Sequence, residues 1–179
     1  MQDTGIVRRI DELGRVVIPK ELRRTLRMRE GDPLEIYTDN ERLIFKKYSP
    51  IASINTHASA VAEGLREFTN KTCIITDNDS VVYVSGANRK EDVGKTISVE
   101  LEKVMKNRKS LLCNKKTGKV VKIIKGEETL ANSQAVVPII SQGDCYGSVV
   151  VLGKDGVEIS EQELKMAELG ASFLSRQFD

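Results

Sequence analysis

The sequence has few cysteines and prolines and no tryptophan. Its 179 residues include three cysteines and four prolines. Cys73, Cys113 and Cys145 are far apart and form no Cys-x-x-Cys pair, so the sequence suggests neither a disulfide framework nor a zinc site. We expect buried free thiols, because an unpaired cysteine behaves as a small apolar residue. The scarcity of proline argues against a long extended linker.

Long apolar runs are also absent. No stretch approaches the ~18 uninterrupted apolar residues of a membrane span, and residues 1–5 lack the apolar core of a signal peptide. We therefore expect a cytoplasmic protein with no membrane partner. Hydrophobic residues make up 40% and charged residues 30% of the chain, which is typical of a folded globular protein.

Catalytic signatures are sparse. Gly94-Lys95-Thr96 ends like a phosphate-binding loop, but that loop requires a glycine where this chain has Arg89. His57 is the sole histidine and has no sequence neighbours that would make it a general base. The chain contains neither the serine-nucleophile motif G-x-S-x-G, nor the zinc-binding motif H-E-x-x-H, nor the dinucleotide-binding motif G-x-G-x-x-G. We predict that the protein is not an enzyme and uses no metal or cofactor.

Positive charge is concentrated near the N-terminus. Between Arg8 and Arg29 there are eight cations and three carboxylates, whereas the whole chain has a net charge of +2. A basic segment on an otherwise mildly acidic chain indicates nucleic-acid binding, although a solvated charged face has the same composition. Arginine predominates, and its guanidinium binds phosphates and base edges through two donors at once. Aromatic residues are absent there, which favours duplex DNA over single strands.

The first fifty residues have the pattern of a small mixed unit. Residues 5–10 and 16–18 resemble strands around a turn, and residues 34–38 and 43–47 resemble a hairpin. Between them, Pro19 fits the first turn of a short helix, which Gly31-Asp32-Pro33 is expected to end. On that helix Leu22 and Leu26 lie opposite Arg23, Arg24 and Arg27. A unit this small, without metal or disulfide, is expected to dimerise.

Two helices with apolar stripes are expected beyond residue 50. Each stripe fits either packing on its own domain or a helical bundle between subunits. Ser160 and Glu163 form a capping-box signature before the second helix. The stripes are Ile51, Ile54, Ala58, Val61, Leu65 and Phe68, and then Leu164, Ala167, Ala171, Leu174 and Phe178.

Strands separate these two helices. A helix over residues 99–107 interrupts them, which gives an antiparallel α+β plan. We expect three parts: a DNA-binding domain at 1–50, a connecting helix at 51–70 and a second domain at 71–179. The expected strands are residues 73–77, 80–84, 119–124, 135–140 and 148–152.

Residues Gly5 to Leu26, followed by Gly31 to Ile36, resemble the AbrB-like transition-state regulators, above all in the run L-G-R-V-V-I-P-K-E-L-R. The resemblance implies a homodimer in which swapped hairpins interleave into one β-barrel. The DNA-contacting basic positions of that family match Arg8, Arg9, Arg15, Arg23 and Arg24. Lys20, Arg27 and Arg29 are basic neighbours for which the resemblance gives weaker support as DNA contacts.

In length and two-part layout the whole chain resembles the stage V sporulation protein T family of endospore-forming bacteria. The fold class implied is α+β, with an N-terminal swapped-hairpin AbrB-like β-barrel dimer and a C-terminal GAF-like antiparallel α/β sandwich domain. A nucleoid-associated regulator that activates and represses sporulation genes is implied, as is a homotetramer formed through the helices at 51–70 and 160–178. A GAF-like domain also implies a pocket for an unidentified small-molecule ligand; Tyr83 and Tyr146 are the aromatic residues expected on its sheet.

Two alternatives to a regulator fit parts of the sequence. An AbrB-like antitoxin would bind a protein partner with its second half. Antitoxins usually bind through disordered tails, whereas residues 71–179 have the pattern of a folded domain. An enzyme built on the second domain would lack a nucleophile and a metal set.

Overall fold

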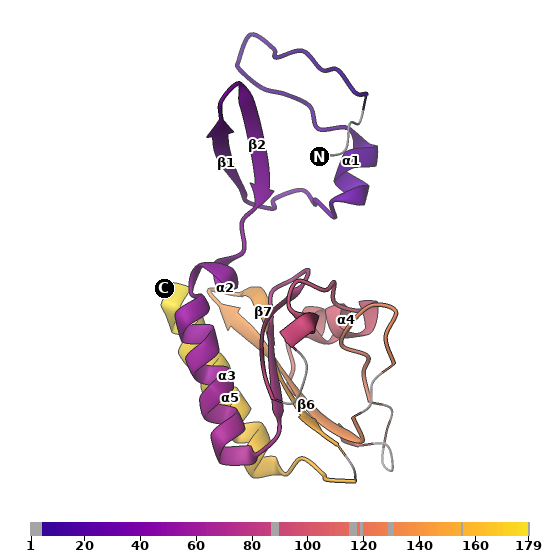
Figure 1. Ribbon diagram of the computed structural model, residues 1–179, viewed down its shortest axis with the longest axis vertical. Coiled ribbons are helices and arrows are strands. Elements are labelled where there is room, and N and C mark those ends of the chain that lie inside the picture. The colour runs from indigo at the N-terminus through magenta and orange to yellow at the C-terminus, as the bar shows by residue number, and fades with distance from the viewer. Residues whose placement is uncertain are drawn as a thin grey trace. The chain divides into compact units, whose positions relative to one another are not determined.

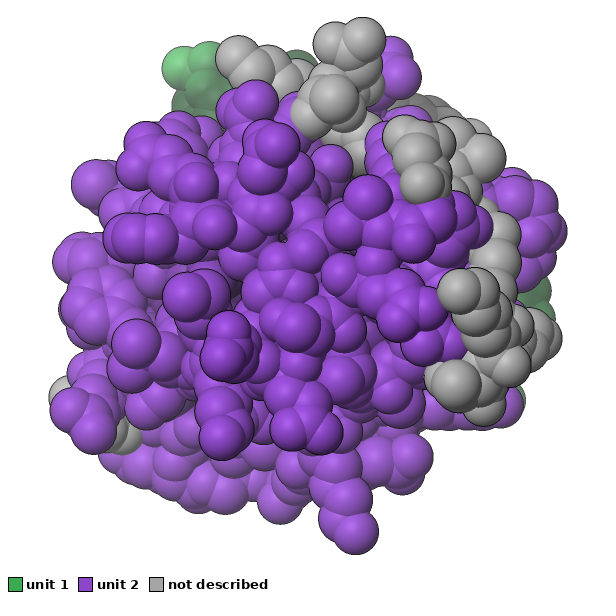
Figure 2. Space-filling view, turned by 90° about the horizontal axis from the view of Figure 1, so that it is seen from below, with its two compact units in different colours: residues 1–48 green, residues 49–179 purple. Residues whose placement is uncertain are grey.

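Figure 1 shows the computed structural model of the chain, which describes residues 5–86, 90–114, 118, 120–128, 131–154 and 156–178. The chain divides into two compact units, residues 1–48 and residues 49–179, which Figure 2 distinguishes by colour. Within the described ranges, no helix is both long and apolar enough to cross a membrane.

The first unit contains one helix and one hairpin: α1 (Lys20–Thr25), β1 (Leu34–Asp39) and β2 (Arg42–Lys47). β1 and β2 are antiparallel, and Asp39 lies opposite Arg42, so the turn consists of Asn40 and Glu41. Asn40 has a φ of 51°, a left-handed conformation that asparagine tolerates well. The predicted hairpin is confirmed, and each strand is one residue longer at the turn.

α1 begins after Pro19 as predicted but ends earlier than expected. Arg27 has a φ of 53°, and the Met28 N–H donates to the Arg23 carbonyl at 2.7 Å. This reversal closes the helix at Thr25. The expectation that Gly31-Asp32-Pro33 ends the helix is therefore wrong, and Leu26 and Arg27 lie outside it.

The two strands predicted over residues 5–10 and 16–18 do not form within the single chain. Both segments flank a turn in which the Asp11 N–H donates to the Arg15 carbonyl at 3.0 Å. Val7 and Val17 are 85% and 74% exposed. A strand needs a neighbouring backbone to bond with, and the described part of this chain supplies none for these segments.

The second unit is a five-stranded antiparallel sheet between two helical layers (Figure 1). The strand order is β4-β3-β7-β6-β5. α3 and α5 lie side by side on one face, and α4 covers the other. The strands are β3 (Thr72–Thr76), β4 (Val81–Ser85), β5 (Leu111–Asn114), β6 (Ser133–Ser141) and β7 (Asp144–Gly153). The helices are α2 (Pro50–Ser53), α3 (Asn55–Thr69), α4 (Val99–Asn107) and α5 (Glu161–Ser175), with 3₁₀ turns at Lys90–Asp92 and Arg176–Phe178.

Four of the predicted strands are confirmed, but the one at 119–124 is wrong. Lys119 lies outside the described residues, and residues 120–123 are not in a strand; β5 is the strand at Leu111–Asn114 instead. Val120 and Ile123 are buried, so their apolar character reflects burial in a loop. The amide of the buried Gln134 bonds both the carbonyl and the N–H of Val121, which replaces the backbone partner of a strand.

Alternation along the strands divides the apolar side chains between the two faces. In β7, Val149 and Val151 join the core beneath α3 and α5, whereas Val150 and Leu152 join the core beneath α4. Leu101 and Met105 of α4 belong to the second of these cores and pack there with Val150 and Leu152. The unit is thus a sandwich in which one sheet lies between two apolar cores, each covered by helix.

The apolar stripes pack within their own unit. The first is interrupted at Ile54, which separates α2 from α3, and its members contribute to the same core as those of α5. Phe68 is the exception, since its side chain is 82% exposed. Of the two arrangements the pattern left open, packing on the second domain is the one observed. The predicted capping box of Ser160 and Glu163 is present.

Candidate nucleic-acid interface

Arg15 lies in a tight turn that orients its side chain. Asp11 Oδ1 accepts hydrogen bonds from the backbone N–H groups of Leu13 and Arg15 at 3.0 and 2.8 Å. Asp11 Oδ2 accepts from Arg15 Nε at 2.9 Å. The bond from the Arg15 backbone N–H, followed by that from its side chain, lowers the pKa of Asp11. Gly14 makes the turn at a φ of +74°, and the Arg15 side chain stays 70% exposed.

The other four predicted DNA-contacting arginines are exposed as well. Arg8 and Arg9 lie in the segment before the turn, and Arg23 and Arg24 lie in the last turn of α1. Arg8 Nη1 donates to the neighbouring Val7 carbonyl at 3.2 Å. Cations at a helix C-terminus also complement the helix dipole, so Arg23 and Arg24 stabilise α1 where they stand.

The first unit has almost no interior. Among its described residues, Pro19 alone is buried. Many of its large apolar side chains are exposed, among them Ile10 at 70% and Ile36 at 61%. Apolar surface of this extent is unusual on a stable monomer and marks a surface that another chain covers.

Sequence reasoning missed the link between α1 and the hairpin. Asp32 Oδ2 pairs with Lys47 Nζ at 3.0 Å and accepts from the Arg29 N–H at 2.8 Å. Lys47 Nζ also donates to the Arg27 carbonyl at 3.0 Å. Burial opposes ionisation of Asp32, but these partners together hold its pKa below the ordinary value. No sequence signal joins residues fifteen or twenty positions apart.

The residues of the second unit that were weighed for catalysis have structural partners. Lys95 Nζ pairs with Asp92 at 2.7 Å and with Glu127 at 2.8 Å, so the loop after Gly94 is closed by side chains of the protein itself. The His57 ring lies 6.0 Å from that of Phe173. No cluster of metal-ligating side chains occurs within the described ranges.

The cysteines and tyrosines lie on the sheet. Cys73 is fully buried, and burial raises the pKa of its thiol to about 12. Cys113 and Cys145 are half-buried rather than buried, and burial raises their thiol pKa values too. Tyr83 and Tyr146 are in β4 and β7, where both pack against the core beneath α3 and α5.

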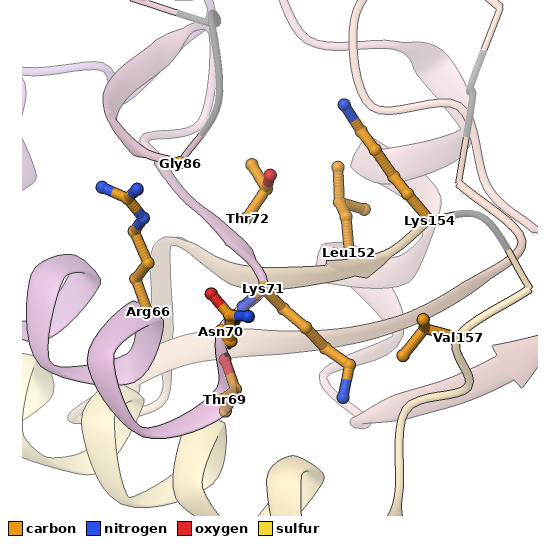
Figure 3. A pocket seen from close by; sticks show the side chains of 9 residues that line it. All are labelled: Arg66, Thr69, Asn70, Lys71, Thr72, Gly86, Leu152, Lys154 and Val157. Carbon is orange, nitrogen blue, oxygen red and sulfur yellow. Dashed lines mark hydrogen bonds between the residues drawn. The ribbon is translucent and has the colours of Figure 1, made fainter.

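A pocket of about 360 Å³ opens where α3 ends and β3 begins (Figure 3). Arg66, Lys71 and Lys154 bring three cations to it, and Leu152 forms part of its apolar wall. Lys71 is paired with Glu163.

Comparison with known proteins places both units. A family model described as "Stage V sporulation protein T C-terminal, transcription factor" matches residues 53–179, and one described as "Antidote-toxin recognition MazE, bacterial antitoxin" matches residues 7–53. The second unit is similar to the GAF domain of the Acinetobacter phosphoenolpyruvate-protein phosphotransferase, with a TM-score of 0.56 and 19% identity over 70% of this chain and 86% of that one. The GAF-B domain of DevS from Mycobacterium smegmatis gives a TM-score of 0.53 and 17% identity, over 68% and 89%.

These findings define a class: transcription factors in which an AbrB-like N-terminal unit precedes a GAF-like unit, as predicted. Over 50 residues the chain is 68% identical to the transition state regulatory protein AbrB of Bacillus subtilis, covering 28% of this chain and 52% of that protein. Over 180 residues the chain is 46% identical to stage V sporulation protein T of Bacillus subtilis, covering 100% of this chain and 99% of that protein. The chain belongs to the stage V sporulation protein T family.

Proposed function

We propose that the protein regulates transcription in sporulation by binding duplex DNA through a dimer of residues 1–50. The observation that carries the proposal is that the unit exposes the five arginines named above, while Pro19 is the single buried residue among those described. The unit needs a partner to bury its apolar side chains, and a second copy doubles its arginines. Its relatives' names, a transition state regulator and a transcription factor, agree with this use.

In the proposed dimer, residues 5–10 and 16–18 of each chain pair with strands of the partner, which supplies the backbone bonds they lack. Arg8, Arg9, Arg15, Arg23 and Arg24 contact phosphates and base edges, because long cationic side chains on a rigid frame suit both tasks. Asp11 holds Arg15 by Nε alone, so the rest of the guanidinium can reach DNA.

We propose that residues 51–70 and 71–179 join two dimers into a tetramer located in the cytoplasm on the nucleoid. Because the apolar stripes face their own core, the contact surface is the outer face of α3 and α5. Its large apolar side chains are exposed: Phe68 at 82%, Leu169 at 73%, Phe173 at 45% and Met166 at 40%.

A small-molecule ligand of the GAF-like unit remains a prediction. The pocket of Figure 3 suits an anion, because Arg66 and Lys154 have no ion-pair partner in the described chain. Inorganic phosphate should raise the unfolding temperature of the wild type in a salt-matched thermal scan. An equal rise in the Arg66→Gln, Lys154→Gln double variant would place the anion elsewhere.

An antitoxin is the second candidate, because the bacterial antitoxin model matches residues 7–53. It is less well supported, because the second unit is a folded domain with two apolar cores rather than a tail that orders on a partner. Limited proteolysis separates the two: a resistant fragment containing residues 71–179 contradicts a disordered-tail antitoxin.

Gel shift against a random duplex DNA pool across a salt series tests the regulator directly. Arg15→Ala and Arg24→Ala should each weaken binding about tenfold or more, and each should flatten the slope of log K against log salt by about 0.9 per lost contact. Arg176→Ala, which removes an exposed arginine of the second unit, is the matched control. Light scattering should give both variants the wild-type mass. A monomer would instead show that these arginines maintain the dimer rather than contact DNA.

A further inference from the structure

A second concentration of positive charge lies in the GAF-like unit. Residues 103–125 contain no aspartate or glutamate, and they contain more cations than residues 8–29 do. The net charge of the whole chain hides this segment, because the rest of the second unit is acidic. Its cations are Lys103, Lys106, Arg108, Lys109, Lys115, Lys116, Lys119, Lys122 and Lys125.

Four of these cations form a continuous exposed group, which we call the α4 cationic surface: Lys103, Lys106, Arg108 and Lys109. The first two are three residues apart on the outer side of α4, opposite the buried Leu101 and Met105. Arg108 caps the helix in a left-handed conformation with a φ of 56°, and Lys109 follows it. The group therefore extends from the middle of α4 past its end.

These four side chains have no carboxylate partner within the described chain. Lys71, Lys95 and Lys122 each pair with a glutamate or aspartate. The helix dipole accounts for Lys106 and Arg108 at the end of α4 but leaves Lys103 and Lys109 unexplained. Four unneutralised cations within seven residues repel one another, so their placement suits an external polyanion.

The surroundings of the surface suit phosphate groups. A hollow of about 470 Å³ beside Lys109 is lined also by Val104, Asn107, Ser110 and Leu111. Amide and hydroxyl groups beside lysine are common phosphate ligands in protein–DNA complexes. Residues 99–125 contain no aromatic residue, so they lack the stacking platform of a single-strand binder. They also lack the aromatic anchors of a protein interface, where lysine is usually depleted.

We propose that the α4 cationic surface is a second DNA-binding surface, which contacts the phosphates of duplex DNA without reading its sequence. The inference rests on the proposed function, since it assumes that the protein works on DNA. Contact through a second unit adds affinity by raising the local concentration of DNA at both surfaces. The GAF-like unit would thereby contribute to DNA binding itself.

The test compares two triple variants of the full chain on a long random duplex across a salt series. Lys103→Gln, Lys106→Gln, Lys109→Gln removes three charges from the surface, and Lys125→Gln, Lys165→Gln, Arg176→Gln removes three exposed charges elsewhere in the same unit. At about 0.1 M salt the first should bind at least tenfold more weakly than the second, with a slope flatter by about 0.9 per lost contact. Circular dichroism should show that both variants unfold at the wild-type temperature. If the triple variant does not fold, the single variant Lys106→Gln replaces it, with a smaller loss of DNA affinity expected.

Equal binding by the two triple variants would overturn the inference while leaving the proposed function intact. If the wild type itself fails to shift DNA, both are wrong. If Arg15→Ala binds like the wild type while the surface variant does not, the second unit is the DNA-binding part and only the role of the first unit fails. Labelled poly-L-glutamate provides the last comparison. If the wild type binds this probe and the surface variant does not, while both bind DNA equally, the inference is overturned in favour of an acidic protein partner.

Discussion

At the scale of single residues, Gly147 shows a requirement that composition cannot reveal. It lies in β7, where an added Cβ would be 1.9 Å from the carbonyl oxygen of Thr76 in the neighbouring strand. Next to it, the hydroxyls of Thr76 and Ser148 share a buried hydrogen bond of 2.8 Å. Glycine thus lets two central strands approach, and no strained φ is involved.

Gly147→Ala should lower the free energy of unfolding by about 1–3 kcal/mol, because the backbone of β3 cannot yield as a side chain would. Thermal unfolding followed by circular dichroism measures the loss. Gly64→Ala is the control: its Cβ meets nothing within 4 Å, and alanine in the middle of α3 should stabilise by up to about 1 kcal/mol. Similar unfolding temperatures for the two variants would mean that β3 and β7 adjust freely.

At the scale of elements, Glu163 joins α5 to the start of β3. Its carboxylate accepts from the Ser160 N–H at 2.8 Å, which completes the capping box, and also pairs with Lys71. Burial opposes ionisation of Glu163, but the bond from Lys71 and those from Ser160 outweigh it, so its pKa is lowered. A single side chain therefore caps one element and ties it to another.

Glu163→Gln should lower the free energy of unfolding by about 1–2 kcal/mol at pH 7. Because the folded pKa lies below the unfolded one, this stabilisation is fully present above the unfolded pKa of about 4.3. It is lost as the pH falls through the folded pKa, so the wild type should approach the variant in acid. Denaturant unfolding at pH 7 and at successively lower pH checks this, with the exposed Glu161→Gln as control; a constant difference between wild type and variant would contradict it.

At the scale of the whole molecule, both units have apolar surface that a single chain leaves exposed. In the first unit this surface belongs to the proposed dimer, and in the second it belongs to the outer face of α3 and α5. The two proposed contacts use different residues. Assembly can therefore be dissected one interface at a time.

The double variant Leu169→Glu, Phe173→Glu should halve the mass measured by light scattering, from tetramer to dimer. In the proposed tetramer each glutamate would be buried between helices without a partner for its charge. In the folded unit alone both positions are partly exposed, so the variant should still fold. Lys165→Glu, on the same helix but not apolar, should keep the wild-type mass. A double variant that stays tetrameric would show that the dimers meet through another surface.

Several features were determined by the sequence alone because their signals are local. The bounds of α4, the capping box of α5 and the hairpin at residues 34–47 each depend on residues within a turn or two of one another. The run from Leu13 to Arg23 was sufficient to indicate the family. A helix period, a cap or a turn is encoded by neighbours, and so it is readable without knowing the rest of the fold.

Tertiary structure decided the features that depend on which distant segment lies alongside. The stripe of α3 could face its own sheet or another subunit, and only the fold of the second unit assigned it to the core. The run at 119–124 was apolar because it is buried, and whether a buried segment pairs as a strand depends on partners such as Gln134. In each case the deciding contact joins residues far apart in sequence, and chain closure over such distances leaves no local pattern.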